Sequence, residues 1–185
     1  MKRKLSKEQY VTYTWKNGRG QSVRIAGDAA DPFNWRISIS RIESSGPFSN
    51  YTDYQRFLIP LTEGRLRLRH EGKQWIDVPR MHVHSFKGDW ETEAACEKPI
   101  DDFNVMVRGN VEASVVAVML AKGQATPLRI EGHRHYLYCV AGAFELGEQI
   151  NAGDTLEVIQ RGRLAPFKAL TDRTEVIVVT LTGVK

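Results

Sequence analysis

The stretch WRISISRIESSGPFSNYTDYQRFLIPLTEG, residues 35–64, decides the fold. Its first part alternates between apolar and polar side chains, which point to opposite faces of a strand. The apolar face carries Trp35, Ile37 and Ile39. The polar face carries Arg36, Ser38 and Ser40. A turn at residues 44–47 and an apolar run at residues 57–61 follow, so the stretch predicts two strands in a hairpin-like unit flanked by Arg36 and Arg56.

The rest of the chain continues this strand pattern. Residues 66–70 alternate strictly, and residues 115–120 and 176–181 are continuous apolar runs typical of buried strands. Residues 15–20 contain Asn17-Gly18, which suits the positive φ angles of a tight hairpin turn. Helical periodicity is almost absent. The sequence therefore predicts an all-β sandwich or barrel.

A slight similarity between two segments of the sequence indicates two related halves. Residues 61–68 and residues 140–146 each run from a strand through a glycine turn into a return strand. We expect an N-terminal half at residues 1–110 and a C-terminal half at residues 111–185, packed together as one compact unit.

Composition and charge exclude several classes of protein. The chain has 185 residues, 42% hydrophobic and 26% charged, which is typical of a globular protein. No apolar run reaches the roughly 18 residues of a membrane span, and the basic N-terminus has no apolar segment behind it, so we expect a cytoplasmic protein without a membrane partner. The net charge of +4 comes largely from the first ten residues, without a nucleic-acid recognition motif. Nucleic acid is therefore not an expected partner, and Cys96 and Cys139 are expected to be buried, reduced thiols.

Two His-x-His pairs are candidates for metal binding. His82 and His84 form one pair, and His133 and His135 form the other. Residues two apart share a strand face, so each pair could bind one metal ion, but a site needs a third ligand. Cupin metal sites add a glutamate a few residues later and a further histidine. After His135 no glutamate occurs before Glu145, and after His84 the nearest acids are Asp89 and Glu91, with no histidine before the second pair. The favoured interpretation is histidines without a metal, and no cofactor is expected.

The stronger chemical signal is a set of polar residues suited to an anion: Asn17, Arg36, Ser38, Arg56 and Asn104. An arginine fork binds a carboxylate with two hydrogen bonds, and the neutral side chains can orient a ligand. Asp101 and Asp102 are adjacent and face opposite ways on a strand, so they do not form an acid/base dyad. The set contains no obvious base or nucleophile, which favours binding over catalysis.

Seven motifs occur in an order and spacing that resemble the HutD/Ves family. They lie at residues 15–20, 35–40, 46–49, 54–56, 61–64, 86–89 and 102–106. The resemblance is specific in the first half and loose after residue 110. Two positions depart from the family's pattern: Ser40, where alanine is commoner, and residues 52–55, where a turn containing Pro-Gly is usual.

The resemblance implies a bicupin, which is two jelly-roll β-barrels in one chain, in a cytoplasmic bacterial protein. One branch of the family is associated with histidine utilisation, and the Ves branch with stress and cold response. The motif positions imply a ligand pocket built from Asn17, Trp35, Arg36, Ser38, Phe48, Arg56 and Asn104. Arg36 and Arg56 would clamp a carboxylate, the amide and hydroxyl groups would orient the ligand, and the two aromatic residues would form wall or core.

Three functional hypotheses remain open. The first is a metal-independent bicupin that binds a small acidic metabolite resembling formimidoylglutamate or formylglutamate, with a regulatory or housekeeping role. The second is a metal-dependent cupin enzyme that uses His82 and His84, or His133 and His135. The third is a protein-interaction module that uses the arginine row Arg65, Arg67 and Arg69. A homodimer also stays open.

Overall fold

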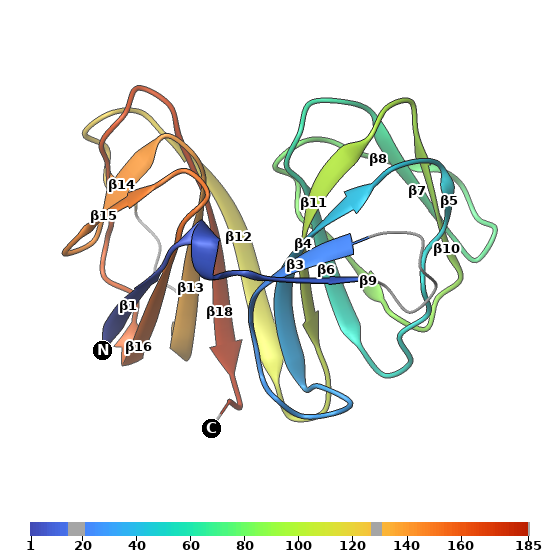
Figure 1. Ribbon diagram of the computed structural model, residues 1–185, viewed down its shortest axis with the longest axis horizontal. Helices are drawn as coiled ribbons and strands as arrows, with labels where there is room; N and C mark the ends of the chain where they lie inside the picture. Colours follow the sequence, from blue (N-terminus) through green and yellow to red (C-terminus); the bar gives the residue numbers. More distant parts are fainter. Residues whose placement is uncertain (15–20, 127–130, 185) are drawn as a thin grey trace. The chain divides into compact units, whose positions relative to one another are not determined.

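The computed structural model describes residues 1–14, 21–126 and 131–184. In these ranges the only helix is a single 3₁₀ turn, η1 (Lys7–Gln9), and all other regular elements are strands (Figure 1). The prediction of an all-β chain is confirmed. No helix in these ranges is long and apolar enough to cross a membrane.

The chain divides into two compact units. Unit N is Val11–Gly109, and unit C combines Met1–Tyr10 with Asn110–Lys185. The division differs from residues 1–110 and 111–185 in its first ten residues. They belong with unit C because strand β1 (Lys2–Leu5) pairs antiparallel with β16 (Thr155–Arg163), from Lys2 opposite Val158 to Leu5 opposite Thr155 (Figure 1).

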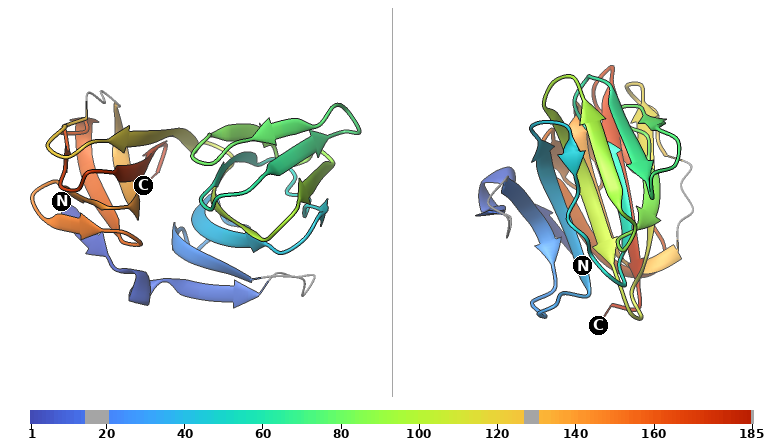
Figure 2. Two further views of the ribbon diagram at one scale, coloured as in Figure 1. Left: turned by 90° about the horizontal axis from the view of Figure 1, so that it is seen from above. Right: turned by 90° about the vertical axis from the view of Figure 1, so that its right-hand side faces the viewer.

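Unit N contains two antiparallel sheets whose strands curve around a common interior (Figure 2). The larger sheet has the order β2 (Val11–Thr14), β3 (Gln21–Gly27), β4 (Trp35–Ile42), β11 (Ile100–Val107), β6 (Gln55–Pro60), β9 (His84–Lys87). The smaller sheet has the order β5 (Gly46–Pro47), β10 (Thr92–Cys96), β7 (Leu66–His70), β8 (Ile76–Val78).

The two strands of the opening stretch are not a hairpin. Strand β11 lies between β4 and β6 and pairs with both. It brings a third set of alternating side chains into the unit, with Asp102, Asn104 and Met106 on the same face as Arg36 and Ser38. Local sequence pattern cannot anticipate this insertion, because β11 follows β6 by about forty residues.

The interior of unit N is apolar at one end. Its buried cluster draws on both sheets and consists of Ile42, Leu58, Leu66, Leu68, Val78, Phe86 and Ala94. Strand β7 shows the expected alternation, with Leu66, Leu68 and His70 buried and Arg67 and Arg69 half-buried on the other face. The other end of the interior is polar and holds the candidate site.

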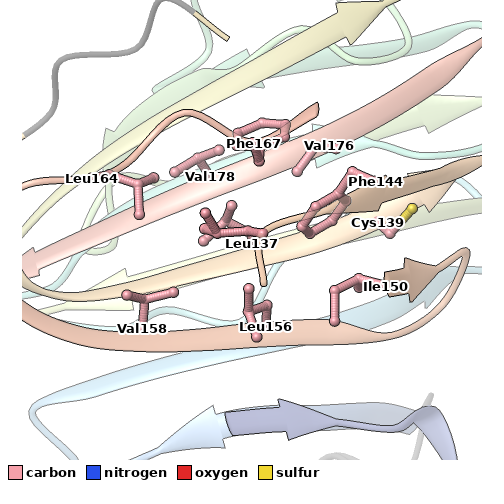
Figure 3. Close-up of a cluster of buried hydrophobic side chains, with 11 residues drawn as sticks. Leu137, Cys139, Phe144, Ile150, Leu156, Val158, Leu164, Phe167, Val176 and Val178 are labelled. Carbon is pink, nitrogen blue, oxygen red and sulfur yellow. The ribbon is translucent and has the colours of Figure 1, made fainter. Parts of the chain in front are cut away.

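Unit C also has two antiparallel sheets. The larger has the order β1, β16, β13 (Glu131–Ala141), β18 (Thr174–Thr182), β12 (Glu112–Leu120). The smaller has the order β15 (Gln149–Asn151), β14 (Ala143–Glu145), β17 (Lys168–Ala169). A continuous apolar cluster fills the space between them, including Leu137, Phe144, Leu156, Phe167 and Val178 (Figure 3).

Candidate functional site

A cavity opens on the inner face of the larger sheet of unit N. Its volume is about 590 Å³ including the space open to solvent. Its walls come from six strands and the segment after β5: Tyr13, Ser22, Arg36, Ser38, Ser40, Ile42, Pro47, Phe48, Ser49, Tyr51, Arg56, Asp102, Asn104 and Met106.

Strand register explains how residues distant in sequence meet here. Arg36 on β4 lies opposite Met106 on β11, which in turn lies opposite Arg56 on β6. The two arginine backbones are therefore two strand spacings apart, roughly 9–10 Å, which is close enough for long side chains to converge. The next rows along the same face pair Ser38 with Asn104 and Ser40 with Asp102.

Both arginines gather around one aromatic ring. The guanidinium carbon of Arg36 lies 6.0 Å from the centroid of Tyr51, and that of Arg56 lies 5.5 Å from it. Arg36 also lies 3.9 Å above Phe33, and Arg56 lies 4.8 Å from Phe86. The rings hold the two cations in place through cation–π contact.

The donors of both arginines are incompletely paired within the described residues. Arg36 donates one long bond of 3.5 Å to the Tyr51 hydroxyl, and Arg56 donates to the Ser49 carbonyl at 3.3 Å. The buried Nε atoms of Arg36 and Arg56 have no hydrogen-bond partner among those residues. Burial lowers the pKa of Arg56, and the nearby Asp102 opposes this effect. A buried donor without a partner costs free energy, so both arginines favour an acceptor between them.

Asp102 is the one carboxyl group among the described lining residues, and it is 2% exposed. Its Oδ2 accepts a hydrogen bond from the Asn104 amide, and its buried Oδ1 has no partner within the described ranges. Burial raises the pKa of Asp102 to about 7, although Asn104 and Arg56 favour the ionised form. The carboxyl group can therefore exist in either protonation state near neutral pH.

Hydroxyl groups complete the polar wall. Ser22 and Ser40 share a hydrogen bond of 2.6 Å between their Oγ atoms, and the Asn104 amide lies 3.5 Å from the Ser40 hydroxyl. Ser38 is buried and lines the cavity beside them. The departure from the family pattern at Ser40 thus adds a hydroxyl group to this wall.

The structure brings together five of the predicted site residues: Arg36, Ser38, Phe48, Arg56 and Asn104. Trp35 does not line the cavity, because it alternates with Arg36 and is buried on the opposite face of β4. Asn17 lies outside the described residues.

Sequence reasoning missed Tyr13, Tyr51 and Asp102 as lining residues. Asp102 carried a usable signal, since it lies two residues from Asn104 and must share its strand face. Tyr51 carried none, because its position depends on a contact between distant loops. Its backbone N–H donates to Gly88 at 2.8 Å, and a Cβ on Gly88 would overlap the Tyr51 carbonyl oxygen. The glycine is thus required for the close approach that sets Tyr51 against the arginines.

The first His-x-His pair is split. His82 is exposed, whereas His84 lies with its Nε2 atom 2.9 Å from Nε2 of His70. The ring planes are within 2° of each other and the centroids are 5.2 Å apart. This separation equals the 2.9 Å between the two nitrogens plus the distance from each nitrogen to its own ring centre. The rings therefore face each other edge to edge, and their nitrogens share a proton along one line rather than converging on a metal ion.

Hydrogen bonding fixes the direction of this pair. The Thr92 hydroxyl donates to the Trp90 carbonyl at 3.2 Å and lies 2.9 Å from Nδ1 of His70. When that hydroxyl donates to the carbonyl, His70 donates through Nδ1 and accepts through Nε2, and His84 is the donor. Burial lowers the pKa of His70 to about 4 and also lowers that of His84, which keeps the pair neutral.

The second His-x-His pair is split in the same way. His133 is exposed, whereas His135 is fully buried with Nδ1 2.9 Å from the Thr180 hydroxyl. A bulge between Gly132 and Arg134 shifts the register there. Across the described ranges, no group of three or more histidine, cysteine or acidic side chains is placed to hold a metal ion.

The arginine row, which comprises Arg65 just before β7 and Arg67 and Arg69 on it, is engaged with neighbouring side chains. Arg65 pairs with Asp77 at 2.8 Å, and Arg69 pairs with Glu93 at 2.8 Å. Arg67 lies 5.5 Å from the Trp75 ring centroid. The row offers less free charge to a protein partner than the sequence pattern indicates.

The family model of HutD matches residues 7–175 of the chain. The chain belongs to the HutD family. An uncharacterized 21.2 kDa protein in the hutC 3′ region of Pseudomonas putida is 33% identical over 108 residues, which are 55% of this chain and 56% of that relative. The match to this relative thus spans little more than half its length. Protein Ves of Escherichia fergusonii is 24% identical over 144 residues, covering 76% of this chain and 73% of Ves.

Solved structures agree with this membership. A conserved protein of unknown function from Pseudomonas aeruginosa PAO1 has a TM-score of 0.84 and 25% identity, with 100% of both chains covered. HutD from Pseudomonas fluorescens SBW25 has a TM-score of 0.80 and 26% identity, covering 99% of this chain and 100% of that one. The bacterial pirin YhhW of Escherichia coli, in complex with nickel(II), has a TM-score of 0.73 at 13% identity over 100% of both chains, a likeness of fold alone. The prediction of a cupin-like fold is confirmed, and the two units of this HutD-family chain fit the bicupin arrangement.

Proposed function

We propose that unit N binds a small organic acid of the formimidoylglutamate or formylglutamate type through Arg36 and Arg56. The observation that carries this proposal is the pair of arginines around Tyr51, each with a buried Nε atom that has no hydrogen-bond partner among the described residues. Ser38 and Asn104, which line the same cavity, orient the ligand.

The electrostatics of the cavity support an anionic ligand. Two cations near one ring repel each other, and desolvation adds to the cost of holding Arg56 in the interior. Asp102 supplies at most one negative charge against the two arginines. A carboxylate between them provides charge-assisted hydrogen bonds, which are about twice as strong as neutral ones.

The site favours binding without catalysis. The serine hydroxyls serve the polar wall: those of Ser22 and Ser40 bond to each other, and the Asn104 amide lies 3.5 Å from the Ser40 hydroxyl. For this HutD-family chain, we assign the ligand site a regulatory or housekeeping role in histidine utilisation or stress response. Family membership supports this assignment, as does the hutC-region location of the Pseudomonas putida relative.

A thermal-shift series with formimidoylglutamate, formylglutamate, glutamate and urocanate tests the proposal. A saturable ligand at 100 times its Kd adds about 2.7 kcal/mol to the stability of the folded chain. The expected result is a concentration-dependent rise in Tm with at least one of the first two compounds. If none of the four shifts Tm up to millimolar concentration, the proposal fails.

Substitution of the clamp identifies the site. Arg36→Ala and Arg56→Ala are each expected to abolish the shift without unfolding the chain. Arg41→Ala is the matched control, because Arg41 lies on the same strand as Arg36, is 52% exposed, and pairs with Asp101 at 3.0 Å outside the cavity. Binding that survives both clamp substitutions, or that is lost with Arg41→Ala, would show that the carboxylate lies elsewhere.

A further inference from the structure

The cavity contains a buried hydrogen-bond acceptor, on Asp102, as well as the buried donors of the two arginines. Asp102 lies on strand β11, on the same face as Met106, which is opposite Arg36 and Arg56, and Asp102 itself is opposite Ser40. Its Oδ2 is bound to Asn104, and its Oδ1 is buried in the lining without a partner among the described residues. A nearly fully buried acceptor that bonds nothing in the described chain marks a place for a donor on the ligand.

We propose that Asp102 makes the cavity selective for acids that also carry a cationic N–H group, an amidinium or an ammonium. The carboxylate of the ligand lies between Arg36 and Arg56, and its N–H donates to Oδ1 of Asp102. The inference rests on the proposed function, since it presupposes the carboxylate clamp.

Donor and acceptor complementarity leads to this selectivity. The arginines can only donate, so they define where the anion lies. An ionised Asp102 can only accept, so it repels a second anion or a carbonyl oxygen and attracts an N–H group. The described charged side chains of the lining total two positive charges and one negative charge, which an acid with one cationic group matches position by position.

The ionisation of Asp102 adjusts to the ligand. With a pKa raised to about 7 by burial, the carboxyl group is partly protonated at neutral pH. The charged or titratable groups around it are Arg36 on β4, Arg56 on β6, Asp101 on its own strand, and Tyr13 and Tyr51 in the cavity wall. A cationic N–H group favours the ionised form, so its binding releases a proton, whereas an acid without a cation favours the protonated form.

Calorimetric titration with two matched probes tests the proposal. N-formimidoylglutamate and N-formylglutamate have the same carboxylates and differ at the formyl position, where one has a cationic NH₂ group and the other an oxygen. We expect the folded chain to prefer the amidinium by about tenfold or more in Kd, as a charge-assisted bond contributes. Asp102→Asn is expected to remove that preference, because its amide keeps an acceptor for Asn104 and presents a donor to the ligand.

Asp101→Asn is the matched control. The same substitution at the neighbouring residue removes an exposed ion pair with Arg41 and leaves the cavity unchanged, so the preference should persist. Equal affinity for both probes, or a preference that survives Asp102→Asn, overturns the inference while the carboxylate clamp stands. If neither probe binds the unaltered chain, the proposed function fails and the inference with it.

Discussion

The interiors of the two units differ in chemistry although both are enclosed by antiparallel sheets. In unit C, the central strands β13 and β18 present Leu137, Cys139, Val176 and Val178 to a continuous apolar cluster (Figure 3). In unit N, the central strands β4 and β11 present arginine, serine, aspartate and asparagine at one end of the interior.

This difference in chemistry implies that the two interiors contribute differently to the stability of the fold. Burial of apolar side chains stabilises the cluster between the two sheets of unit C. Unit C also buries Glu157 and Glu175, but these carboxylates are paired with Arg3 and Arg173. Unit N holds a buried arginine and a buried carboxyl group, and taking such groups out of water costs several kcal/mol unless they are paired. The proposed ligand would supply the partner that these two groups of unit N lack among the described residues.

The largest expected effect on stability comes from comparing one substitution in the interior of each unit. Phe144→Ala removes a fully buried ring from unit C and should lower the free energy of unfolding by about 3–5 kcal/mol. Arg56→Leu in unit N replaces a desolvated cation and should change it by no more than about 1 kcal/mol, or stabilise the chain. Urea unfolding of both variants measures the contrast. A loss with Arg56→Leu as large as that with Phe144→Ala would make Arg56 a structural residue.

The free energy of unfolding should depend on pH through the ionisation of Asp102. Its pKa is about 7 in the folded chain against 3.8 in the unfolded chain, so the folded state holds the proton more tightly. Its contribution to stability is present below pH 4 and is lost as pH rises through 7. Asp102→Asn should therefore match the unaltered chain near pH 4 and exceed it by about 2–4 kcal/mol at pH 8.

Comparing Asp102→Asn with the unaltered chain separates the contribution of Asp102 to the pH dependence of stability from that of the histidines. The pKa of His70 is lowered to about 4, so its contribution has the opposite sign and is lost as pH falls from 6.5 to 4 in both proteins. Denaturant midpoints at pH 4, 6 and 8 measure the difference. A constant offset across that range would mean that Asp102 keeps an ordinary pKa.

Alternation along single strands could be predicted from the sequence, and with it the shared face of Arg36, Ser38 and Ser40. The choice of residue types, and then the family motifs, predicted that Arg56 and Asn104 share a site, and the register places them on adjacent strands. Trp35 belongs to the core, one of the two roles expected for it, because Trp35 and Arg36 must face opposite ways on β4.

The remaining features depend on long-range pairing. Neither the insertion of β11 between β4 and β6 nor the pairing of β1 with β16 has a local signal, because register between distant strands is set by the whole sheet. The His70–His84 pair was missed for the same reason, since the sequence pattern draws attention to His82 instead. The raised pKa of Asp102 follows from its burial. That burial depends on the assembly of distant strands around the cavity, which the sequence pattern does not show.

The smallest expected effect concerns the Ser22–Ser40 hydrogen bond in the polar wall of unit N. Ser40→Ala restores the residue commoner in the family and should cost about 0.5–1.5 kcal/mol of stability, the usual net value of one hydrogen bond. Affinity for the acid should change by less than about tenfold, because Ser40 flanks Asp102 without belonging to the arginine clamp.

A double-mutant cycle with Ser22→Ala separates this bond from the other contacts of each serine. If the two hydroxyl groups act mainly on each other, the double variant should lose clearly less stability than the sum of the two single losses. Additive losses would show that each serine has a separate role in the wall. A loss of ligand binding with Ser40→Ala as complete as that with Arg56→Ala would move Ser40 into the clamp, and the polar interior of unit N would then extend to the position where this chain departs from its family.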